Sequence, residues 1–423
     1  MVETETLAVL MFGAVVAHVH HRRSAGYRLE YEMQAREPGS TPLSLSLPPA
    51  IGTFTGEVVE TYLWGLLPED PRARVAIQRT HAGVNPEKPL SLLSAIGKEC
   101  AGAVQLCPPE EVDRVAHSVG TLESASLADV EARLSAMRID PEAGWVMPHE
   151  HWSLAGTQSK FGIRHKDGTW WWAHGAQPTT HIVKPGVREL RGQALVEHLT
   201  MRAGHHLGLR IARTEFLDFL SERAVVVERF DRAIEAGGAV VRTHQEDVCQ
   251  ALGIRHKYEE YGGPSASAII RLLRESAATA QQGRDNVNDF VDGLLFNTVI
   301  AATDAHARNY ALVLKGDQVQ FAPLYDVATS LAYDPPGAGA RRLSMQIGGT
   351  FDAAGVDDNA WRRFARENRL DDDRVLDRVD HLRNGVVDAF EAAVQEVASD
   401  DWDGQVSEVA QRLLPSLATH LAR

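Results

Sequence analysis

The order of the strands and helices expected between residues 145 and 232 constrains the fold more than any other feature of this sequence. "KFGIRHKDGTWWWAHG" predicts two strands joined by a hairpin turn, because Asp167-Gly168 is a dipeptide that such turns favour. "TTHIVKP" predicts a third strand that ends at Pro185, since proline cannot donate to a strand ladder. Three consecutive strands therefore open this part of the chain.

A helix and a second hairpin complete the pattern. "ALVEHLTMRAGHHLGL" repeats apolar residues at helical spacing and stops at Gly208, and "IARTEFLDFL" and "AVVVERF" predict two strands joined across Ser221-Glu222-Arg223. Strand, strand, strand, helix, strand, strand is the order of a protein-kinase small lobe. After residue 232 the prediction is mainly helical, with helices at 244–252, 264–281, 287–302, 358–368, 372–398 and 404–421 and one hairpin at 310–322.

Residues 1–110 predict an added N-terminal α/β subdomain. The apolar runs "LAVLMFGAVVAHV", "GYRLEYEM" and "PLSLSLPP" alternate with turns and predict short strands, and "GEVVETYLWGLLPEDP" predicts a helix that its prolines end. Residues 111–144 hold many acids and helix formers and predict a helical linker. The expected fold class is α+β, a two-lobed protein-kinase-like fold with its small lobe at 145–232 and its helical large lobe at 233–423.

Composition and charge narrow the class of protein. The 423 residues are 44% hydrophobic, which suffices for two or three domains, and the net charge of −14 disfavours nucleic-acid binding over a broad basic face. Three cysteines without metal-ligand spacing suggest a reducing compartment. The apolar run at 7–19 is too short to span a bilayer. We expect a cytoplasmic protein without a membrane partner, in which DNA contact needs a local patch or a partner.

The stretch "ATDAHARNYALVL" (301–313) carries the strongest signal of chemistry. It places Asp304 five residues before Asn309 and ahead of the predicted hairpin, and "FAPLYDVATS" places Asp326 directly after that hairpin. Phosphoryl transfer needs a carboxylate that orients the nucleophile and oxygen ligands that hold Mg²⁺. The ordered Asp, Asn, Asp array therefore predicts magnesium-dependent phosphotransfer.

Other parts of a nucleotide site can be sought at their expected places. Lys184 lies on the third strand, where a kinase places the lysine that contacts the nucleotide phosphates, and Glu197 on the next helix could pair with it. "SLAGTQSK" (153–160) could cap the phosphates with backbone N–H groups, although Gly156 is its one glycine. "VERFDR" (227–232) ends the last small-lobe strand, where a hinge would present backbone groups to adenine. The alternatives are that Lys184 is an exposed strand lysine, that Glu197 is a solvated glutamate and that "VERFDR" is an ordinary strand end.

With these motifs in place, the chain resembles the HipA family of toxin kinases along nearly its whole length. The resemblance rests on "PLSLSLP", "LWGLLPED", "SLAGTQSK", "PTTHIVKP", "VERFDR", "QEDVCQALG", "YGGP", "ATDAHARN" and "FAPLYDVAT". It implies a serine/threonine kinase that uses ATP and Mg²⁺ to phosphorylate a protein, with an aminoacyl-tRNA synthetase (glutamyl type favoured) as the expected substrate, so that translation and growth stop. It also implies control by a HipB-like helix-turn-helix antitoxin, which carries the toxin onto operator DNA.

The resemblance further implies a role for each matching residue. Asp304 would be the catalytic base, with Asn309 and Asp326 as magnesium ligands. Ser153 matches a serine that relatives autophosphorylate, and Ser159 is a competing acceptor. The residues implied to bind the nucleotide are Ala155, Gly156, Thr157, Gln158, Ser159, Lys160, Lys184, Glu228, Arg229, Phe230, His306, Arg308, Asn309, Tyr325 and Asp326.

Two departures and two alternatives stay open. Ala305 stands where the family often has glycine, and "TFDAAGVDD" after residue 349 is acidic where a segment in direct contact with DNA would be basic. Operator contact is therefore expected mainly through the antitoxin. A small-molecule kinase of the aminoglycoside type shares the Asp, Asn, Asp array, but the front subdomain and "SLAGTQSK" argue against it. A catalytically silent antitoxin-binding subunit is the other alternative, and the intact phosphotransfer positions disfavour it.

Overall fold

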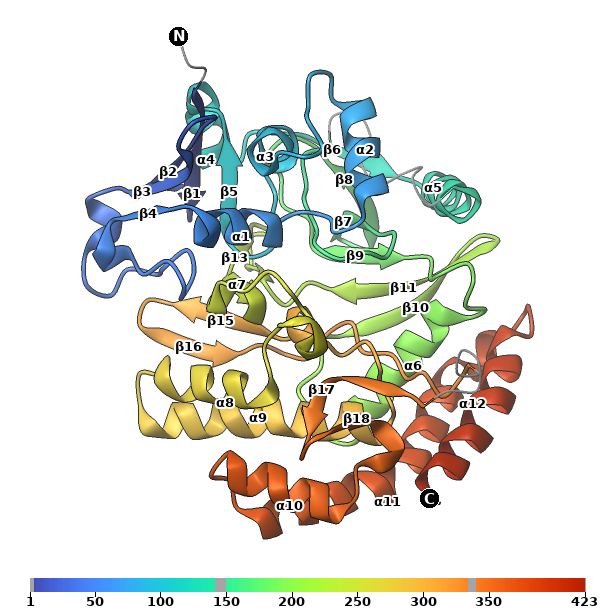
Figure 1. Cartoon of the computed structure of the whole chain (residues 1–423). Helices are drawn as coiled ribbons and strands as arrows, with labels where there is room; N and C mark the ends of the chain where they lie inside the picture. Colours follow the sequence, from blue (N-terminus) through green and yellow to red (C-terminus); the bar gives the residue numbers. More distant parts are fainter. Residues whose placement is uncertain (1–3, 141–149, 334–339, 423) are drawn as a thin grey trace.

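The computed structural model describes residues 4–140, 150–333 and 340–422 (Figure 1). Two sheet-bearing parts lie side by side in the upper half of Figure 1, and a helical part fills the lower half. The predicted boundary between the linker and the small lobe, at residues 144 and 145, lies outside the described residues. No helix of the described residues is long and apolar enough to cross a membrane.

The N-terminal part of the chain, residues 4–116, is called the front part. It is built on a sheet with the strand order β4-β3-β2-β1-β5. Phe12 and Gly13 join the first two strands with positive φ angles of 53° and 80°, the left-handed backbone that a tight hairpin turn requires. Its strands are β1 (Thr4–Met11), β2 (Ala14–Arg22), β3 (Gly26–Tyr31), β4 (Thr53–Thr55) and β5 (Val104–Cys107). Its helices are α1 (Glu57–Gly65), α2 (Pro71–Thr80), α3 (Pro89–Ile96) and α4 (Val112–Ala116).

The prediction of a strand at "PLSLSLPP" is wrong. This segment is a loop, because its polar groups bond to side chains and to a distant helix rather than to a neighbouring strand. The Leu43 N–H donates to the Tyr31 hydroxyl at 3.1 Å, and the Tyr31 hydroxyl donates to the Leu47 carbonyl at 2.6 Å. The Ser46 hydroxyl donates to the Gln250 carbonyl at 2.7 Å. The loop therefore joins the front part to the helical part.

The second sheet has the strand order β10-β11-β9-β7-β8-β6 and carries the predicted strand, strand, strand, helix, strand, strand sequence. The second hairpin turns at Leu220-Ser221, earlier than predicted, since Phe219 pairs with Glu222. Its strands are β6 (Leu122–Ala125), β7 (Phe161–Lys166), β8 (Thr169–Ala173), β9 (His181–Lys184), β10 (Thr214–Phe219) and β11 (Glu222–Glu228). Helices α5 (Leu127–Ile139) and α6 (Gln193–His206) accompany it.

The linker is not wholly helical as predicted. Between α4 and α5 the chain forms β6, which pairs with β8 and extends the sheet past the "WWW" strand. The acids of this segment suggested helix, but "LESA" lies along the edge of β8 and satisfies the outer backbone groups of that strand.

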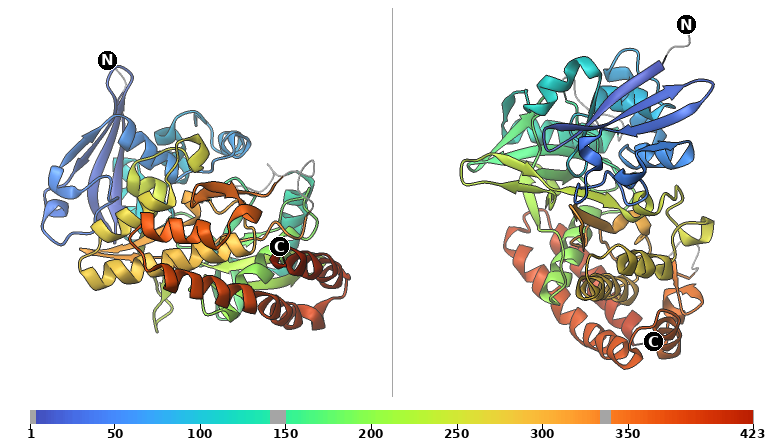
Figure 2. Two further views of the ribbon diagram at one scale, coloured as in Figure 1. Left: turned by 60° about the horizontal axis from the view of Figure 1, so that its bottom comes forward. Right: turned by 90° about the vertical axis from the view of Figure 1, so that its left-hand side faces the viewer.

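The helical part follows β11 and contains α7 (Val248–Leu252), α8 (Ala266–Glu275), α9 (Ala280–Val299), α10 (Asp358–Glu367), α11 (Asp372–Val397) and α12 (Gln405–Leu421). Short strands accompany them: β12 (Arg232–Ile234), β13 (Val240–Arg242), β14 (His244–Asp247), β15 (Ala311–Lys315), β16 (Gln318–Phe321), β17 (Arg342–Ile347) and β18 (Thr350–Asp352). Figure 2 shows α11 and α12 beside α6, so the end of the chain supports the small-lobe helix.

Two helices of the structure, α7 and α9, have other bounds than those predicted from the sequence. The first half of the helix predicted at 244–252 is strand β14, which pairs with β15, and Asp247 then caps the short α7 by accepting a hydrogen bond from the Gln250 N–H. Helix α9 begins at Ala280, seven residues before the predicted start, because Thr279 caps a polar first turn that hides the apolar period. It ends at Val299, so Asp304 lies in the loop after the helix.

Two large apolar clusters form the core. One fills the helical part and reaches α6 and β11 of the small lobe. The other is shared by the front part and the small-lobe sheet, where Leu7 and Leu63 of the front part belong to the same cluster as Phe161 and Val183 of the sheet. The front part is therefore packed as a continuation of the small lobe, at the edge of the cleft between the lobes.

Candidate active site

A cavity of about 370 Å³ lies between the small-lobe sheet and the helical part. Of the residues predicted to bind the nucleotide, all but Ser159 line it, and so does Asp304. The cavity is polar at the Asp304 end, while Ile182, Val227 and Phe230 contribute apolar surface. The structure therefore brings together in one cleft predicted residues that lie up to 171 positions apart, Ala155 to Asp326.

Lys184 lies at the centre of a buried charge cluster. Its ammonium donates to Glu197 of α6 at 2.7 Å, the pair expected from the sequence, and to Asp326 at 2.5 Å. Burial alone would lower the pKa of Lys184, but Asp326 and Glu197 outweigh it and raise that pKa above its usual value. Burial raises the pKa of Glu197. Burial would also raise the pKa of Asp326, but Lys184 and Lys160 outweigh it and hold the pKa of Asp326 well below the usual range. Lys184 and Asp326 are thus both charged.

The Asp304 loop is held by its own asparagine. The Asn309 amide nitrogen donates to the Asp304 backbone carbonyl at 2.9 Å, which leaves the amide oxygen as the atom that Asn309 can offer to a ligand. The Asp304 side chain is 73% exposed. His306 is buried, and its Nδ1 has no hydrogen-bond partner among the described residues. Ala305 does not have a positive φ, so glycine is not required beside Asp304.

Asp326 has the left-handed backbone that non-glycine residues rarely adopt, with φ at 58°. Such strain persists where the surroundings impose it and is concentrated at functional sites. The preceding Tyr325 donates its hydroxyl to the Arg308 carbonyl at 2.7 Å, and its ring lies 5.7 Å from the ring of Phe230. Tyr325 therefore connects the Asp326 segment to the Asp304 loop.

The loop at 153–160 turns at Gly156 on the wall of the cavity. Gly156 has φ at 107°, a backbone conformation that residues with a side chain rarely adopt, and its Cα faces the Lys160 ammonium. Lys160 donates to the Ala155 carbonyl at 2.7 Å, and Gln158 donates to Gln193 of α6 at 2.9 Å. Ser153 is fully buried and donates its hydroxyl to the Leu66 carbonyl at 2.5 Å. Ser153 does not line the cavity in this arrangement.

The predicted hinge lies at the end of β11. Glu228 and Phe230 line the cavity, as does Arg229. The Arg229 guanidinium is buried and donates to Glu99 and Asp231, and the Arg229 N–H donates to the Thr180 carbonyl at 2.9 Å. The side chain of Arg229 therefore fixes the hinge to the front part.

Sequence reasoning missed three residues that line or touch the Asp304 end of the cleft. The Tyr258 hydroxyl donates to Asp304 Oδ1 at 2.5 Å. Lys257 and Glu69 line the cavity and form an ion pair with a distance of 3.0 Å. The quoted motifs "YGGP" and "LWGLLPED" lie beside or include these residues, but nothing in the spacing of the sequence shows that the two motifs meet.

The side chains present fit a magnesium nucleotide. Mg²⁺ is usually bound by one or two protein oxygens together with water and substrate phosphates. Asp326 and Asn309 both line the cavity and offer a carboxylate and an amide oxygen. The unpartnered His306 Nδ1 is a further polar atom that a bound ligand could satisfy.

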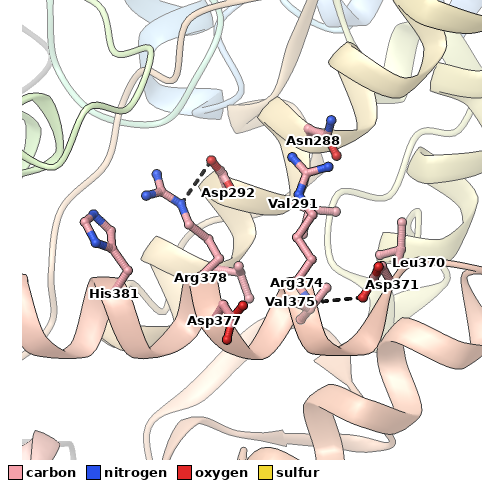
Figure 3. A pocket seen from close by; sticks show the side chains of 11 residues that line it. Asn288, Val291, Asp292, Leu370, Asp371, Arg374, Val375, Asp377, Arg378 and His381 are labelled. Carbon is pink, nitrogen blue, oxygen red and sulfur yellow. Dashed lines mark hydrogen bonds and ion pairs between the residues drawn. The ribbon is translucent and has the colours of Figure 1, made fainter.

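A second hollow of about 540 Å³ lies on the helical part (Figure 3). It is lined by α9 and α11 and the turn before α11, and Arg378 pairs with Asp292 at 3.1 Å across it. The Asp371 carboxylate accepts the Arg374 N–H at 3.1 Å as the cap of α11. None of the predicted site residues lines this hollow, and the Arg378–Asp292 ion pair joins its two helices.

The chain is similar to known proteins over most of its length. The family model of the HipA-like C-terminal domain matches residues 152–390, and that of the HipA N-terminal domain matches residues 7–107. The chain is 32% identical over 375 residues to the protein Y4mE of Sinorhizobium fredii, covering 87% of this chain and 85% of that protein. It is 29% identical over 329 residues to the serine/threonine-protein kinase toxin HipA of Shewanella oneidensis, covering 74% and 71%.

A solved structure shares the fold. HipA of Shewanella oneidensis, in complex with HipB and operator DNA, superposes with a TM-score of 0.80 at 23% identity, covering 98% of this chain and 97% of that one. The predicted fold class, a two-lobed kinase-like α+β fold, is confirmed by this likeness.

Proposed function

The chain belongs to the HipA family, and from this premise we propose that it is a serine/threonine kinase toxin that transfers the terminal phosphoryl group of Mg-ATP to a protein. The observation that carries the proposal is the convergence of Asp304, Asn309, Asp326 and the Lys184–Glu197 pair on one cavity. These groups provide what phosphoryl transfer asks of a protein, namely positioning and charge stabilisation.

Each side chain has a task in this proposal. The exposed Asp304 carboxylate accepts the hydrogen bond of the substrate hydroxyl and orients its oxygen toward the phosphorus. Lys184, held by Glu197, contacts the phosphates, and the backbone of residues 155–160 covers them. Asn309 and Asp326 would hold Mg²⁺, which neutralises charge on the phosphate oxygens when bound.

We propose that the target is an aminoacyl-tRNA synthetase, the glutamyl enzyme being favoured, and that its phosphorylation in the cytoplasm stops translation. Support comes from the toxin name of the Shewanella oneidensis relative and from the family resemblance. We also propose a HipB-like antitoxin as partner, with operator DNA reached mainly through it. The structural neighbour is a complex of HipA with HipB and operator DNA, and the net charge of −14 disfavours direct DNA binding by this chain.

The function is tested by Asp304→Asn, with Asp317→Asn in the exposed β15–β16 turn as the matched control. We expect Asp304→Asn to lower phosphate transfer from labelled Mg-ATP to protein in a cell lysate by about 10²-fold or more, because the amide cannot accept the proton. Mg-ATP affinity by calorimetry should stay within about 3-fold, since the amide has nearly the same shape. Asp317→Asn should match the wild type, and the labelled protein is identified by mass spectrometry.

If Asp304→Asn transfers phosphate to protein at the wild-type rate, Asp304 is not the residue that orients the substrate hydroxyl. Absence of any labelled protein with the wild-type chain, despite ATP binding, would favour the silent antitoxin-binding subunit instead.

A further inference from the structure

The segment after α1 enters the nucleotide cleft from the front part. The Glu69 N–H donates to the Gly156 carbonyl at 3.1 Å, and Pro68 forms an isolated parallel bridge with Gly156. The Glu69 side chain lines the cavity and is 17% exposed. A residue of the front part therefore stands inside a site whose predicted members all come from the kinase part.

The Glu69 carboxylate bridges two cations. Its Oε2 lies 3.0 Å from the Lys257 ammonium, and its Oε1 lies 3.2 Å from the Arg308 guanidinium. Both cations line the cavity with side chains that are 16% and 11% exposed. Burial alone would raise the pKa of Glu69, but Arg308 and Lys257 outweigh it and lower that pKa, so the carboxylate is charged.

The two cations lie at the Asp304 end of the cavity. Tyr258, the residue after Lys257, donates to Asp304, and the Ala307 N–H donates to the Lys257 carbonyl at 3.2 Å. The charge of Lys257 also contributes to lowering the pKa of His306, after the larger effect of burial. Phosphoryl transfer must take place beside Asp304, so these cations face the place of the terminal phosphates rather than that of the adenine.

We propose that Lys257 is a further phosphate-binding cation beside Lys184 and Lys160, that it acts with Arg308 on the terminal phosphates, and that Glu69 is their counter-ion until the triphosphate displaces it. The inference rests on the proposed function, because it assumes that the cleft takes Mg-ATP. It adds a binding residue and gives the front part a direct role in the nucleotide site.

The physical reason is competition for the same donors. Two largely buried cations need a counter-charge when the cleft is empty, and Glu69 supplies one; the buried Asp247 acts on Arg308 as well. Phosphate oxygens are stronger partners for lysine and arginine when they carry more charge. A ligand with three phosphates can displace the carboxylate, whereas adenosine has no group that competes with it. Glu69 therefore makes the cleft discriminate between nucleotides by their terminal phosphates.

The test measures affinities of the full-length chain for Mg-ATP, Mg-ADP and adenosine by calorimetry, and compares the ratio of the Mg-ATP affinity to the adenosine affinity. Because adenosine reports on the intact cleft of each variant, the ratio is independent of partial loss of folded protein. Lys257→Gln should lower the ratio about 10-fold, the loss of one charge-assisted phosphate contact. Glu69→Gln should raise it about 3- to 10-fold, with a smaller rise for Mg-ADP.

Glu87→Gln, the same change at an exposed residue of the front part, is the matched control and should leave the ratio unchanged. A ratio for Lys257→Gln equal to that of the wild type would overturn the assignment of Lys257. A lower ratio for Glu69→Gln would overturn the competition, since it would mean that the carboxylate helps to bind the phosphates. If the wild-type chain binds adenosine but not Mg-ATP, the proposed function fails instead, which distinguishes the two.

Discussion

Lys160 shows how a single side chain couples nucleotide binding to pH. It is buried, donates to the Ala155 carbonyl at 2.7 Å, and belongs to the loop expected to cover the phosphates. Burial lowers its pKa to about 8, although Asp326 acts in the opposite direction. In the empty cleft the lysine is therefore charged at pH 7, and it loses its charge as the pH rises through about 8.

This leads to a prediction for the affinity of Mg-ATP. Phosphate binding favours the charged lysine, so above pH 8 the empty cleft must take up a proton when the nucleotide enters, and affinity should fall by up to about tenfold per pH unit. Below pH 8 the same affinity should be flat. Calorimetry at pH 7 and pH 9 in buffers of different ionisation enthalpy measures this proton uptake.

Lys160→Met is the matched variant, since it keeps a long side chain without the ammonium. It should bind Mg-ATP more weakly than the wild type at pH 7 and show no proton uptake at pH 9. An equal uptake in Lys160→Met would assign the titration to another group.

At the scale of elements, the sequence predicts well what depends on neighbouring residues. The Asp167-Gly168 turn and the order of the small-lobe strands follow from local pattern, and the structure contains them. The Lys184–Glu197 pair is expected from the kinase-like order of these elements, and it is present as well. The wrong element types, at "PLSLSLPP", β6 and β14, are those in which a distant part decides. β14 is a strand because β15 lies beside it. Glu69 and Tyr258 belong to the cleft only because the chain folds back, and no periodicity reveals such contacts.

The loop at 153–160 leads to a prediction about Ser153. Its hydroxyl is buried against the Leu66 carbonyl, so it can accept a phosphoryl group only after the loop leaves the segment at 66–69. Once phosphorylated, the serine cannot return, because a group with nearly two negative charges does not fit that site. We expect phosphate on Ser153 after incubation with Mg-ATP, together with a loss of Mg-ATP affinity and faster proteolysis at this loop.

Peptide mass spectrometry of the wild type and of Ser153→Ala and Ser159→Ala separates the two possible acceptors. Modification that persists in Ser153→Ala and disappears in Ser159→Ala would transfer the role to Ser159. A Ser153-phosphorylated chain that binds Mg-ATP as tightly as the unmodified chain would refute the switch.

At the scale of the whole molecule, the front part is joined to the kinase part by a buried ionic cluster as well as by a shared apolar core. Glu99, between α3 and β5, lies 3.0 Å from Arg229, 2.9 Å from Arg232 and 2.8 Å from Arg242. It also accepts the Thr179 N–H at 3.1 Å. The hinge beside the nucleotide site is thus anchored to the front part by the same side chains. Glu69 can reach the phosphate loop because this anchoring fixes the two parts relative to each other.

The cluster makes Glu99 the residue on which this arrangement most depends. Burial would raise the pKa of Glu99, but Arg232, Arg242 and Arg229 outweigh it and lower that pKa to about 2. Glu99→Gln leaves buried guanidinium groups without their counter-ion and should reduce the free energy of unfolding by about 3–5 kcal/mol at pH 7. Glu37→Gln, the same change at an exposed residue of the front part, should cost less than about 1 kcal/mol.

The pH dependence separates the ionic contribution of Glu99 from simple packing. Because the folded pKa is depressed from 4.5 to about 2, the stabilisation is complete above pH 4.5 and is lost as the pH falls toward 2. The difference in urea stability between the wild type and Glu99→Gln should therefore be largest at pH 7 and shrink at pH 3. A difference that stays constant between these pH values would show that the carboxylate acts through its shape and hydrogen bonds, and the front part would then be held mainly by its apolar core.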